Sequence, residues 1–137
     1  MDIYVVTNKA AIIERCLERI RVTYDNMPAC LQDFDKQDII ILNLQRACQA
    51  AIDLANHICA KKKLGLPQNS GDSFALLADR ELIPSKLATS LKGMVGFRNI
   101  AVHDYQTLNL KILQSIVEKD MWDLEVFTKC IFKMEEL

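Results

Sequence analysis

Three side chains with complementary chemistry stand close together near residue 100. Arg98, His103 and Tyr105 fall within eight residues of one another. A guanidinium grips a phosphate through paired N–H groups, and an imidazole moves protons near neutral pH. A phenol stacks on a base or donates a hydrogen bond. This combination suits a protein that handles a phosphodiester or a nucleotide.

The helical phase of these residues decides whether they can meet. On a continuous helix Arg98 and Tyr105 face nearly the same way, whereas Arg98 and His103 lie about 140° apart around the axis. Asn99 and His103 are four residues apart and stack on one face. If the helix ends near Ala101, the chain can turn there and swing His103 and Tyr105 toward Arg98. Asn99 could then fix the imidazole tautomer through a hydrogen bond.

The elements that must position these residues are all helical. Apolar residues recur at three- and four-residue steps, and no alternating β pattern is present. Helices are predicted over about residues 8–27, 33–63, 73–80, 84–103 and 108–134. Lys61, Lys62 and Lys63 followed by Gly65 indicate the end of the second helix, with Gly65 as the residue free to turn left-handed. We expect an all-α, antiparallel up-and-down helical bundle of four main helices and one short helix, forming a single domain over residues 1–137.

Gly93 and Gly96 lie inside the fourth predicted helix, just before Arg98. Glycine in a helix interior costs about 1 kcal/mol relative to alanine. Either a close approach of another helix or chain, or a local bend of the helix, would explain them.

Composition narrows the class of protein. The net charge is −1, and 17 basic and 18 acidic residues are mixed along the whole chain. No region supplies the one-signed stripe that is typical of a polyanion groove, so a nucleic-acid site must be compact or assembled from several chains. The longest aliphatic run, Ile39–Leu42, is far shorter than the roughly 20 residues that span a bilayer, and the start of the chain is polar. We therefore expect a cytoplasmic protein with no membrane segment.

Metal and disulfide chemistry are not expected. The five cysteines are odd in number and form no CxxC pair, and we interpret Cys48 and Cys59, eleven residues apart on one helical stripe, as small core residues. Asp53 and His57, four apart on the second helix, could form a surface pair or line a cleft, but no third ligand has supporting spacing. No cofactor is predicted.

The arrangement Arg-x4-His-x-Tyr at the end of a late helix resembles the signature of the HEPN superfamily. The layout of the whole chain is most similar to its HepT toxin branch. Arg98, His103 and Tyr105 match the motif, and Asn99 supplies the polar residue that commonly follows the arginine. The resemblance implies a metal-independent endoribonuclease, with Arg98 and His103 catalytic and Asn99 and Tyr105 supporting.

The same resemblance implies particular partners. The chain would be the toxin of a toxin–antitoxin pair, with RNA as substrate and a small MNT-type nucleotidyltransferase as antitoxin. Members act as a homodimer or higher oligomer in which two motifs meet in a cleft. The antitoxin of this branch can attach AMP to the motif tyrosine, which is Tyr105 here.

The chemistry expected of these groups is transesterification. His103 would take the proton from an RNA 2′-hydroxyl, and Arg98 would stabilise charge on the phosphoryl oxygens. Two other functions stay open. A non-catalytic HEPN module could bind nucleotide or RNA through the same residues, and an interaction-only bundle could use Arg98 and Tyr105 as interface contacts. The nucleotidyltransferase could also be the main effector, with this chain as its substrate.

Overall fold

The computed structural model describes residues 3–103 and 109–135. Its elements follow one another as α1 (Ile3–Tyr24), the short 3-10 helix η1 (Pro28–Gln32), α2 (Phe34–Lys62), α3 (Asp72–Asp79), α4 (Ser85–His103), α5 (Leu110–Ser115), the π-helical turn η3 (Ile116–Asp120) and α6 (Trp122–Glu135). No strand occurs in the described part of the chain. The prediction of an all-α fold is confirmed.

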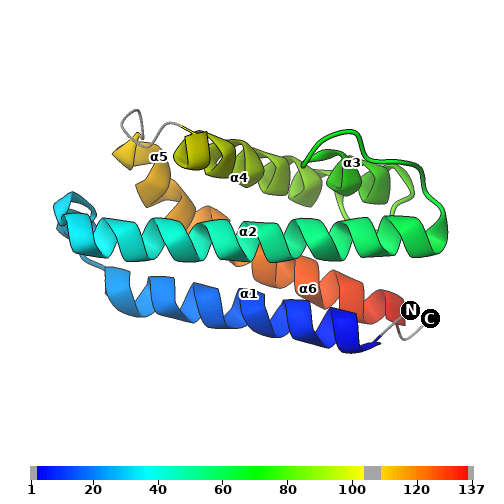
Figure 1. Ribbon diagram of the computed structural model, residues 1–137, viewed down its shortest axis with the longest axis horizontal. Coiled ribbons are helices and arrows are strands. Elements are labelled where there is room, and N and C mark those ends of the chain that lie inside the picture. The colour runs from blue at the N-terminus through cyan, green and yellow to red at the C-terminus, as the bar shows by residue number, and fades with distance from the viewer. Residues whose placement is uncertain (1–2, 104–108, 136–137) are drawn as a thin grey trace.

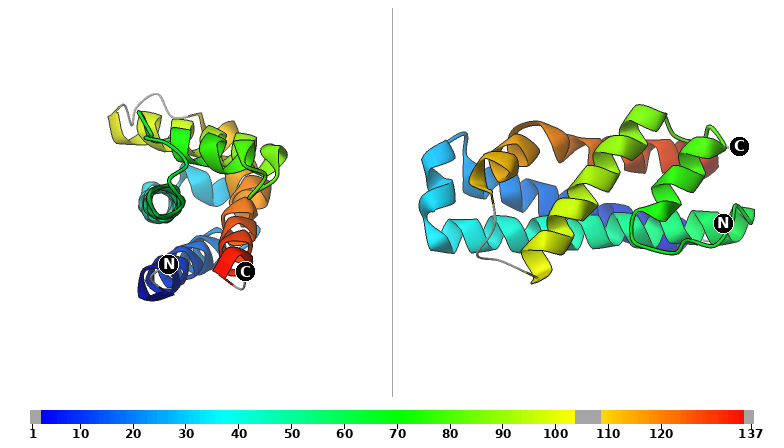
Figure 2. Two further views of the ribbon diagram at one scale, coloured as in Figure 1. Left: turned by 90° about the vertical axis from the view of Figure 1, so that its right-hand side faces the viewer. Right: turned by 90° about the horizontal axis from the view of Figure 1, so that it is seen from above.

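The helices alternate in direction around the long helix α2 (Figure 1). α1 and α2 form an antiparallel pair with the most extensive interhelical packing of the molecule. α6 packs against both, while α3 and α4 cover another side of α2 (Figure 2). Seen from above, α4 crosses α2 obliquely, so that its C-terminal end lies over the first half of α2. The topology is the predicted up-and-down bundle.

The ends of α2 show how local chemistry sets a helix boundary. At the start, the Asp33 carboxylate accepts hydrogen bonds from the backbone N–H groups of Asp35 at 2.9 Å and Lys36 at 3.3 Å. This is an ordinary N-cap, which satisfies donors that the first turn leaves free. At the end, the left-handed residue is Lys63, with φ of 54°, and the N–H of Leu64 bonds to the Cys59 carbonyl at 3.0 Å. The expectation that Gly65 would make this turn is wrong.

Gly65 has a separate role just after the cap. Its φ is +134°, and a Cβ placed there would come 3.3 Å from Leu76 Cδ2. Both the backbone conformation and the packed neighbour therefore favour glycine. Gly93 and Gly96 differ, because a Cβ at either position would meet no atom within 4 Å in the described structure. Close approach of another helix of this chain does not explain them.

The last predicted helix is interrupted. In place of one helix over about 108–134, α5 begins after Asn109, whose side chain accepts from the N–H groups of Lys111 and Ile112. The turn η3 then widens, and Met121 N–H bonds to the Ile116 carbonyl at 2.8 Å, five residues back. The apolar spacing gave no sign of this, because buried residues recur at helical steps on both sides of the turn.

One continuous core fills the space between the helices. Phe74 and Phe127 meet edge to face, with ring centroids 5.3 Å apart. Cys16, Cys30, Cys48 and Cys59 are buried in this core as free thiols, which confirms the expected role of Cys48 and Cys59, while Cys130 is half-buried. Among the described helices, none has the length and apolar character needed to cross a membrane.

Candidate active site

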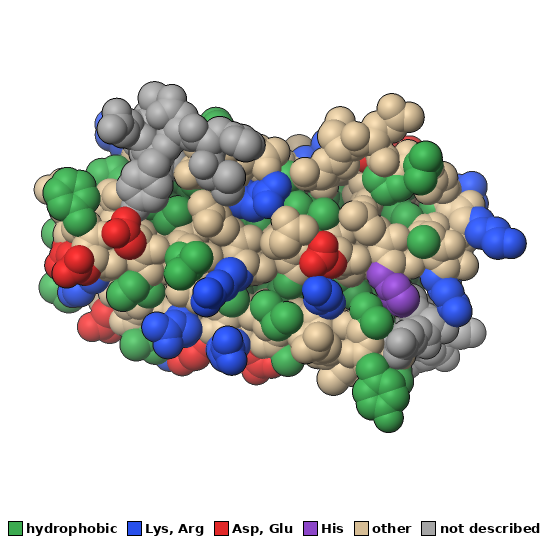
Figure 3. Space-filling view, viewed as in Figure 1, with side chains coloured by type: hydrophobic (Ala, Val, Ile, Leu, Met, Phe, Trp, Pro, Cys, Tyr) green, Lys and Arg blue, Asp and Glu red, His purple; other side chains and the backbone are tan. Residues whose placement is uncertain are grey.

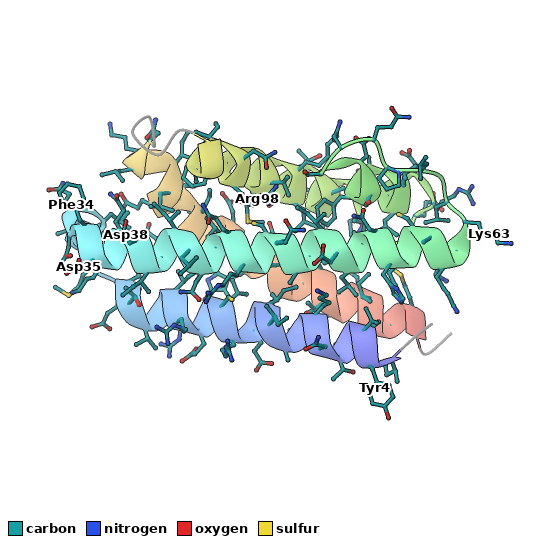
Figure 4. All side chains as sticks on the ribbon, in the orientation of Figure 1. Tyr4, Phe34, Asp35, Asp38, Lys63 and Arg98 are labelled. Atoms are coloured by element: carbon teal, nitrogen blue, oxygen red, sulfur yellow. The ribbon has the colours of Figure 1, made fainter. Side chains whose placement is uncertain are left out.

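Arg98 lies where α4 passes over α2 (Figure 4). Its Nη1 donates to Gln49 Oε1 at 2.8 Å, and its Nη2 donates to Asn99 Oδ1 at 2.5 Å. Its Nε is buried and has no hydrogen-bond partner within the described structure. Both acceptors are neutral amide oxygens, and no described carboxylate pairs with the guanidinium within 4 Å. The side chain is therefore held in place while its positive charge stays uncompensated by these contacts.

A chain of polar contacts continues from Arg98 across the surface of α2. Gln49 Nε2 donates to Asp53 Oδ1 at 2.8 Å. Asp53 Oδ2 in turn accepts from Lys9 Nζ of α1 at 3.1 Å. The four residues Lys9, Asp53, Gln49 and Arg98, which we call the polar chain, join α1, α2 and α4.

The charge of Arg98 also reaches the core beneath it. Burial raises the pKa of the Cys48 thiol to about 12, and the positive charge of Arg98 acts weakly in the opposite direction. Cys48 adjoins Gln49 in α2, so the guanidinium lies over a boundary between buried apolar surface and solvent. Because its pKa is so high, the Cys48 thiol stays protonated at neutral pH and does not act as a nucleophile.

Three exposed arginines gather near Cys16, where α1 and α2 pack together. Burial raises the pKa of the Cys16 thiol. The positive charges of Arg46 in α2 and of Arg15 and Arg19 in α1 are near enough to this thiol to act in the opposite direction. None of the three forms an ion pair within 4 Å with a carboxylate of the described residues. Arg46 and Gln49 are three residues apart and so share a face of α2. Figure 3 shows Lys and Arg side chains spread along the middle of this face.

These arginines change the electrostatic expectation. The sequence predicted no one-signed region, since acids and bases alternate along the chain. Folding separates them locally, because α1 and α2 each place arginines on the surface that they share. We call Arg15, Arg19 and Arg46 the arginine group.

The predicted site residues have different outcomes. Asn99 contacts Arg98, because its Oδ1 accepts from Arg98 Nη2 at 2.5 Å. The helix does not end near Ala101, because α4 stays helical through His103. Its backbone therefore puts residue 103 one turn beyond Asn99 and about 140° around the axis from Arg98. The His103 side chain and the whole of Tyr105 lie outside the described residues, so their approach to Arg98 stays a prediction.

Asp53 and His57 do not form the suggested pair. Asp53 uses its two oxygens for Gln49 and Lys9, and His57 Nε2 is buried without a described partner. No group of three or more potential metal ligands was found among the described side chains. Gln49, Lys9 and the arginine group were all missed from sequence. The one available signal was the i, i+4 spacing of Gln49 and Asp53, which is common on helix surfaces.

An all-α bundle with a fixed, uncompensated arginine beside further exposed arginines has the features of a protein that binds phosphate groups. Residues 13–131 match the family described as ribonuclease HepT-like. The chain belongs to this HepT-like family.

Two named relatives and two solved structures are similar to the chain. It is 51% identical over 127 residues to the mRNA nuclease HepT of Shewanella oneidensis, covering 93% of this chain and 96% of that protein. It is 28% identical over 107 residues to the tRNA nuclease HepT of Aphanizomenon flos-aquae, covering 77% and 72% of the two chains. A tri-AMPylated Shewanella oneidensis HEPN toxin, solved in complex with an MNT antitoxin, superimposes with a TM-score of 0.90 at 50% identity, covering 94% and 97%. A toxin–antitoxin structure with AMP-PNP gives 0.88 at 50% identity, covering 93% and 97%.

Proposed function

We propose that this chain is the toxin of a toxin–antitoxin pair and cuts RNA without a metal ion. The observation that carries the proposal is the state of Arg98 in a member of the HepT-like ribonuclease family. Its guanidinium is fixed by two neutral amides, keeps its charge and lies five residues before His103. Its relatives are named as mRNA and tRNA nucleases. We further propose that residues 1–137 act as one domain and that the activity is cytoplasmic.

The proposed reaction uses the 2′-hydroxyl of RNA as the nucleophile. His103 removes the proton from this hydroxyl, and the 2′-oxygen attacks the adjacent phosphorus. Arg98 binds the non-bridging oxygens and stabilises the negative charge that develops on them. The bond from phosphorus to the 5′-oxygen breaks, and an imidazole of a second copy of the chain gives the leaving oxygen its proton. The products are a 2′,3′-cyclic phosphate and a 5′-hydroxyl.

The remaining motif residues have supporting roles in this proposal. Asn99, already hydrogen-bonded to Arg98, lies one helical turn before His103 and can orient both groups. The arginine group offers additional contacts for the phosphates that flank the cut. Its position beside the polar chain allows a compact RNA site on a protein whose net charge is only −1.

Inhibition by a nucleotidyltransferase follows the same logic. We propose that an MNT-type antitoxin binds the toxin and transfers AMP from a nucleoside triphosphate to the Tyr105 hydroxyl, with release of pyrophosphate. The Shewanella toxin, 50% identical in sequence, was solved in an AMPylated form with its MNT antitoxin. An added phosphodiester and adenine beside Arg98 would occupy the position of the substrate phosphate.

Purified protein tests the nuclease proposal. A labelled oligoribonucleotide is incubated in excess chelator with wild type, Arg98→Ala and His103→Ala, each verified as folded by circular dichroism. We expect wild type to produce 2′,3′-cyclic ends, and each substitution to slow cleavage by about 10²–10⁴-fold. DNA of the same sequence lacks the 2′-hydroxyl and should stay intact. Wild type that binds RNA but never cuts it would support the non-catalytic alternative instead.

Co-expression tests the modification. The toxin is produced together with an MNT-type nucleotidyltransferase, and the intact mass of the toxin is measured. An increase by whole AMP units in wild type, absent from Tyr105→Phe, supports the proposal. An unchanged mass, or an increase that persists in Tyr105→Phe, rejects Tyr105 as the acceptor.

A further inference from the structure

Gln49 is the one residue of the polar chain that touches both Arg98 and an acid. Its Oε1 accepts from Arg98 at 2.8 Å, and its Nε2 donates to Asp53 at 2.8 Å. An arginine can only donate and a carboxylate can only accept. The reversed amide would set two donors against each other and two acceptors against each other. Asp53 and Arg98 together therefore allow a single orientation of the Gln49 amide.

Lys9 completes this arrangement from the neighbouring helix. Its Nζ lies 3.1 Å from Asp53 Oδ2, and the two side chains are 28% and 39% exposed. An ion pair so open to solvent contributes at most about 1 kcal/mol to stability. The ion pair matters more for geometry than for stability, because it holds the Asp53 carboxylate that orients the Gln49 amide. The α1–α2 pair thus serves as a rigid base for a side chain of α4.

Because residue 49 is an amide and not an acid, it holds Arg98 without neutralising the positive charge of the guanidinium. A carboxylate in the same place would form an ion pair with the guanidinium and compete with a phosphate. With Gln49 and Asn99 as acceptors, Arg98 uses one N–H of each Nη group for described partners. Among the described residues the second N–H on each Nη has no partner, so the guanidinium can offer both to a phosphate in a fork.

We propose that Gln49 is a positioning residue for RNA cleavage, which holds the Arg98 guanidinium toward the scissile phosphate and is itself oriented by Asp53 and Lys9. The inference rests on the proposed nuclease function. It assigns a role to three residues outside the Arg-x4-His-x-Tyr motif. Because they lie on the surface of α2 and α1, the role is separable from folding.

The main test compares Gln49→Met and Gln49→Glu with wild type. Methionine keeps the length of the side chain and removes both hydrogen bonds, so Arg98 loses its support. We expect a fall in kcat of about tenfold to a hundredfold with little change in KM, as for a misplaced catalytic group. Glutamate adds an ion pair to Arg98 and repels Asp53, so we expect a raised KM and weaker binding of a 2′-O-methyl RNA that cannot be cut.

A double substitution shows whether Gln49 acts through Arg98. In the Arg98→Ala background, Gln49→Met should slow the residual single-turnover cleavage of RNA by less than about twofold beyond Arg98→Ala alone, because there is no guanidinium left to position. A structural role would give the same extra loss in both backgrounds. Asp53→Ala is the second variant, in case Gln49→Met unfolds. It frees the amide to turn, so we expect it to lower kcat as well.

Gln114→Met is the matched control. Gln114 Nε2 donates to the Glu118 carboxylate at 3.2 Å with the same i, i+4 spacing, but makes no described contact with Arg98. The Gln114→Met variant should cut RNA at the wild-type rate. Cleavage by Gln49→Met at the wild-type rate, while Arg98→Ala is inactive, would overturn the positioning role and leave the nuclease proposal intact. Wild type and Arg98→Ala that are equally inactive toward every RNA would overturn both.

Discussion

The hydroxyl of Tyr24 donates a hydrogen bond to the carboxylate of Glu118, 94 residues further along the chain. This contact ties the end of α1 to the wide turn η3. The residue Tyr24 is 4% exposed, and burial together with the Glu118 carboxylate raises the pKa of its hydroxyl well above the usual range. The end of the bundle is therefore held by a hydrogen bond from a buried, protonated phenol.

Tyr24→Phe should lower the free energy of unfolding by about 1–2 kcal/mol at neutral pH, since it removes a hydrogen bond to a charged group. Because the pKa of Tyr24 is raised in the folded state, its contribution is complete below about pH 10 and is lost as the pH rises further. The difference between wild type and Tyr24→Phe in urea unfolding should therefore shrink above pH 10. Glu118→Gln, which removes the charge but keeps an acceptor, should shift that pH dependence downward. Parallel profiles for wild type and Tyr24→Phe would contradict this account.

The thiols should differ sharply in reactivity. Burial raises the pKa of Cys16, Cys30 and Cys59, and raises that of Cys48 to about 12. Iodoacetamide at pH 8 should therefore add one group to the native protein, on the half-buried Cys130, and five groups in denaturant. Intact mass and peptide mapping measure this. Cys130→Ser should stay unlabelled when native, and equal labelling of Cys48 would show that the core opens at this place.

Gly93→Ala and Gly96→Ala should each stabilise the isolated protein by about 0.5–1 kcal/mol. The space around both positions is open, and alanine favours the helix. Thermal unfolding measures the effect. Loss of self-association or of antitoxin binding, without a gain in stability, would instead show that a helix of another chain approaches α4 here.

Arg46→Ala and Arg19→Ala should weaken RNA binding while leaving kcat close to wild type. Each removed phosphate contact should reduce the slope of log affinity against log salt by about 0.7 for single-stranded RNA. Titration of a 2′-O-methyl RNA at several salt concentrations measures the slope. Arg80→Ala, at the exposed end of α3, is the control and should leave it unchanged. Equal slopes for all three variants would remove the arginine group from the RNA site.

The helices were predictable because buried residues repeat at helical steps along each of them. The ends of the helices were harder to predict where the apolar pattern continues without a break. α4 continues past Ala101, a buried residue, to His103, and no proline or glycine stops it earlier. At η3 the pattern is the same for an α-helical and a π-helical turn, so only the backbone hydrogen bond of Met121 reveals the difference.

The site was predictable only in part. Arg98 and Asn99 were candidates because they belong to a recognisable motif, and the structure shows that they contact each other. Gln49 was not, because its contact with Arg98 joins positions 49 residues apart and depends on how α4 crosses α2. The arginine group could not be predicted from the sequence for a related reason. Charges averaged along a sequence say little about one face, which takes every third or fourth residue from two helices.

Both described ends of the chain, Ile3 and Glu135, emerge at the same extremity of the bundle, and α4 finishes in the opposite half (Figure 1). A fluorescent protein or affinity tag joined to either end therefore projects away from Arg98 and from the surface where substrate would lie. Live-cell tracking and surface immobilisation can thus be done on a protein whose proposed RNA-binding face is left uncovered.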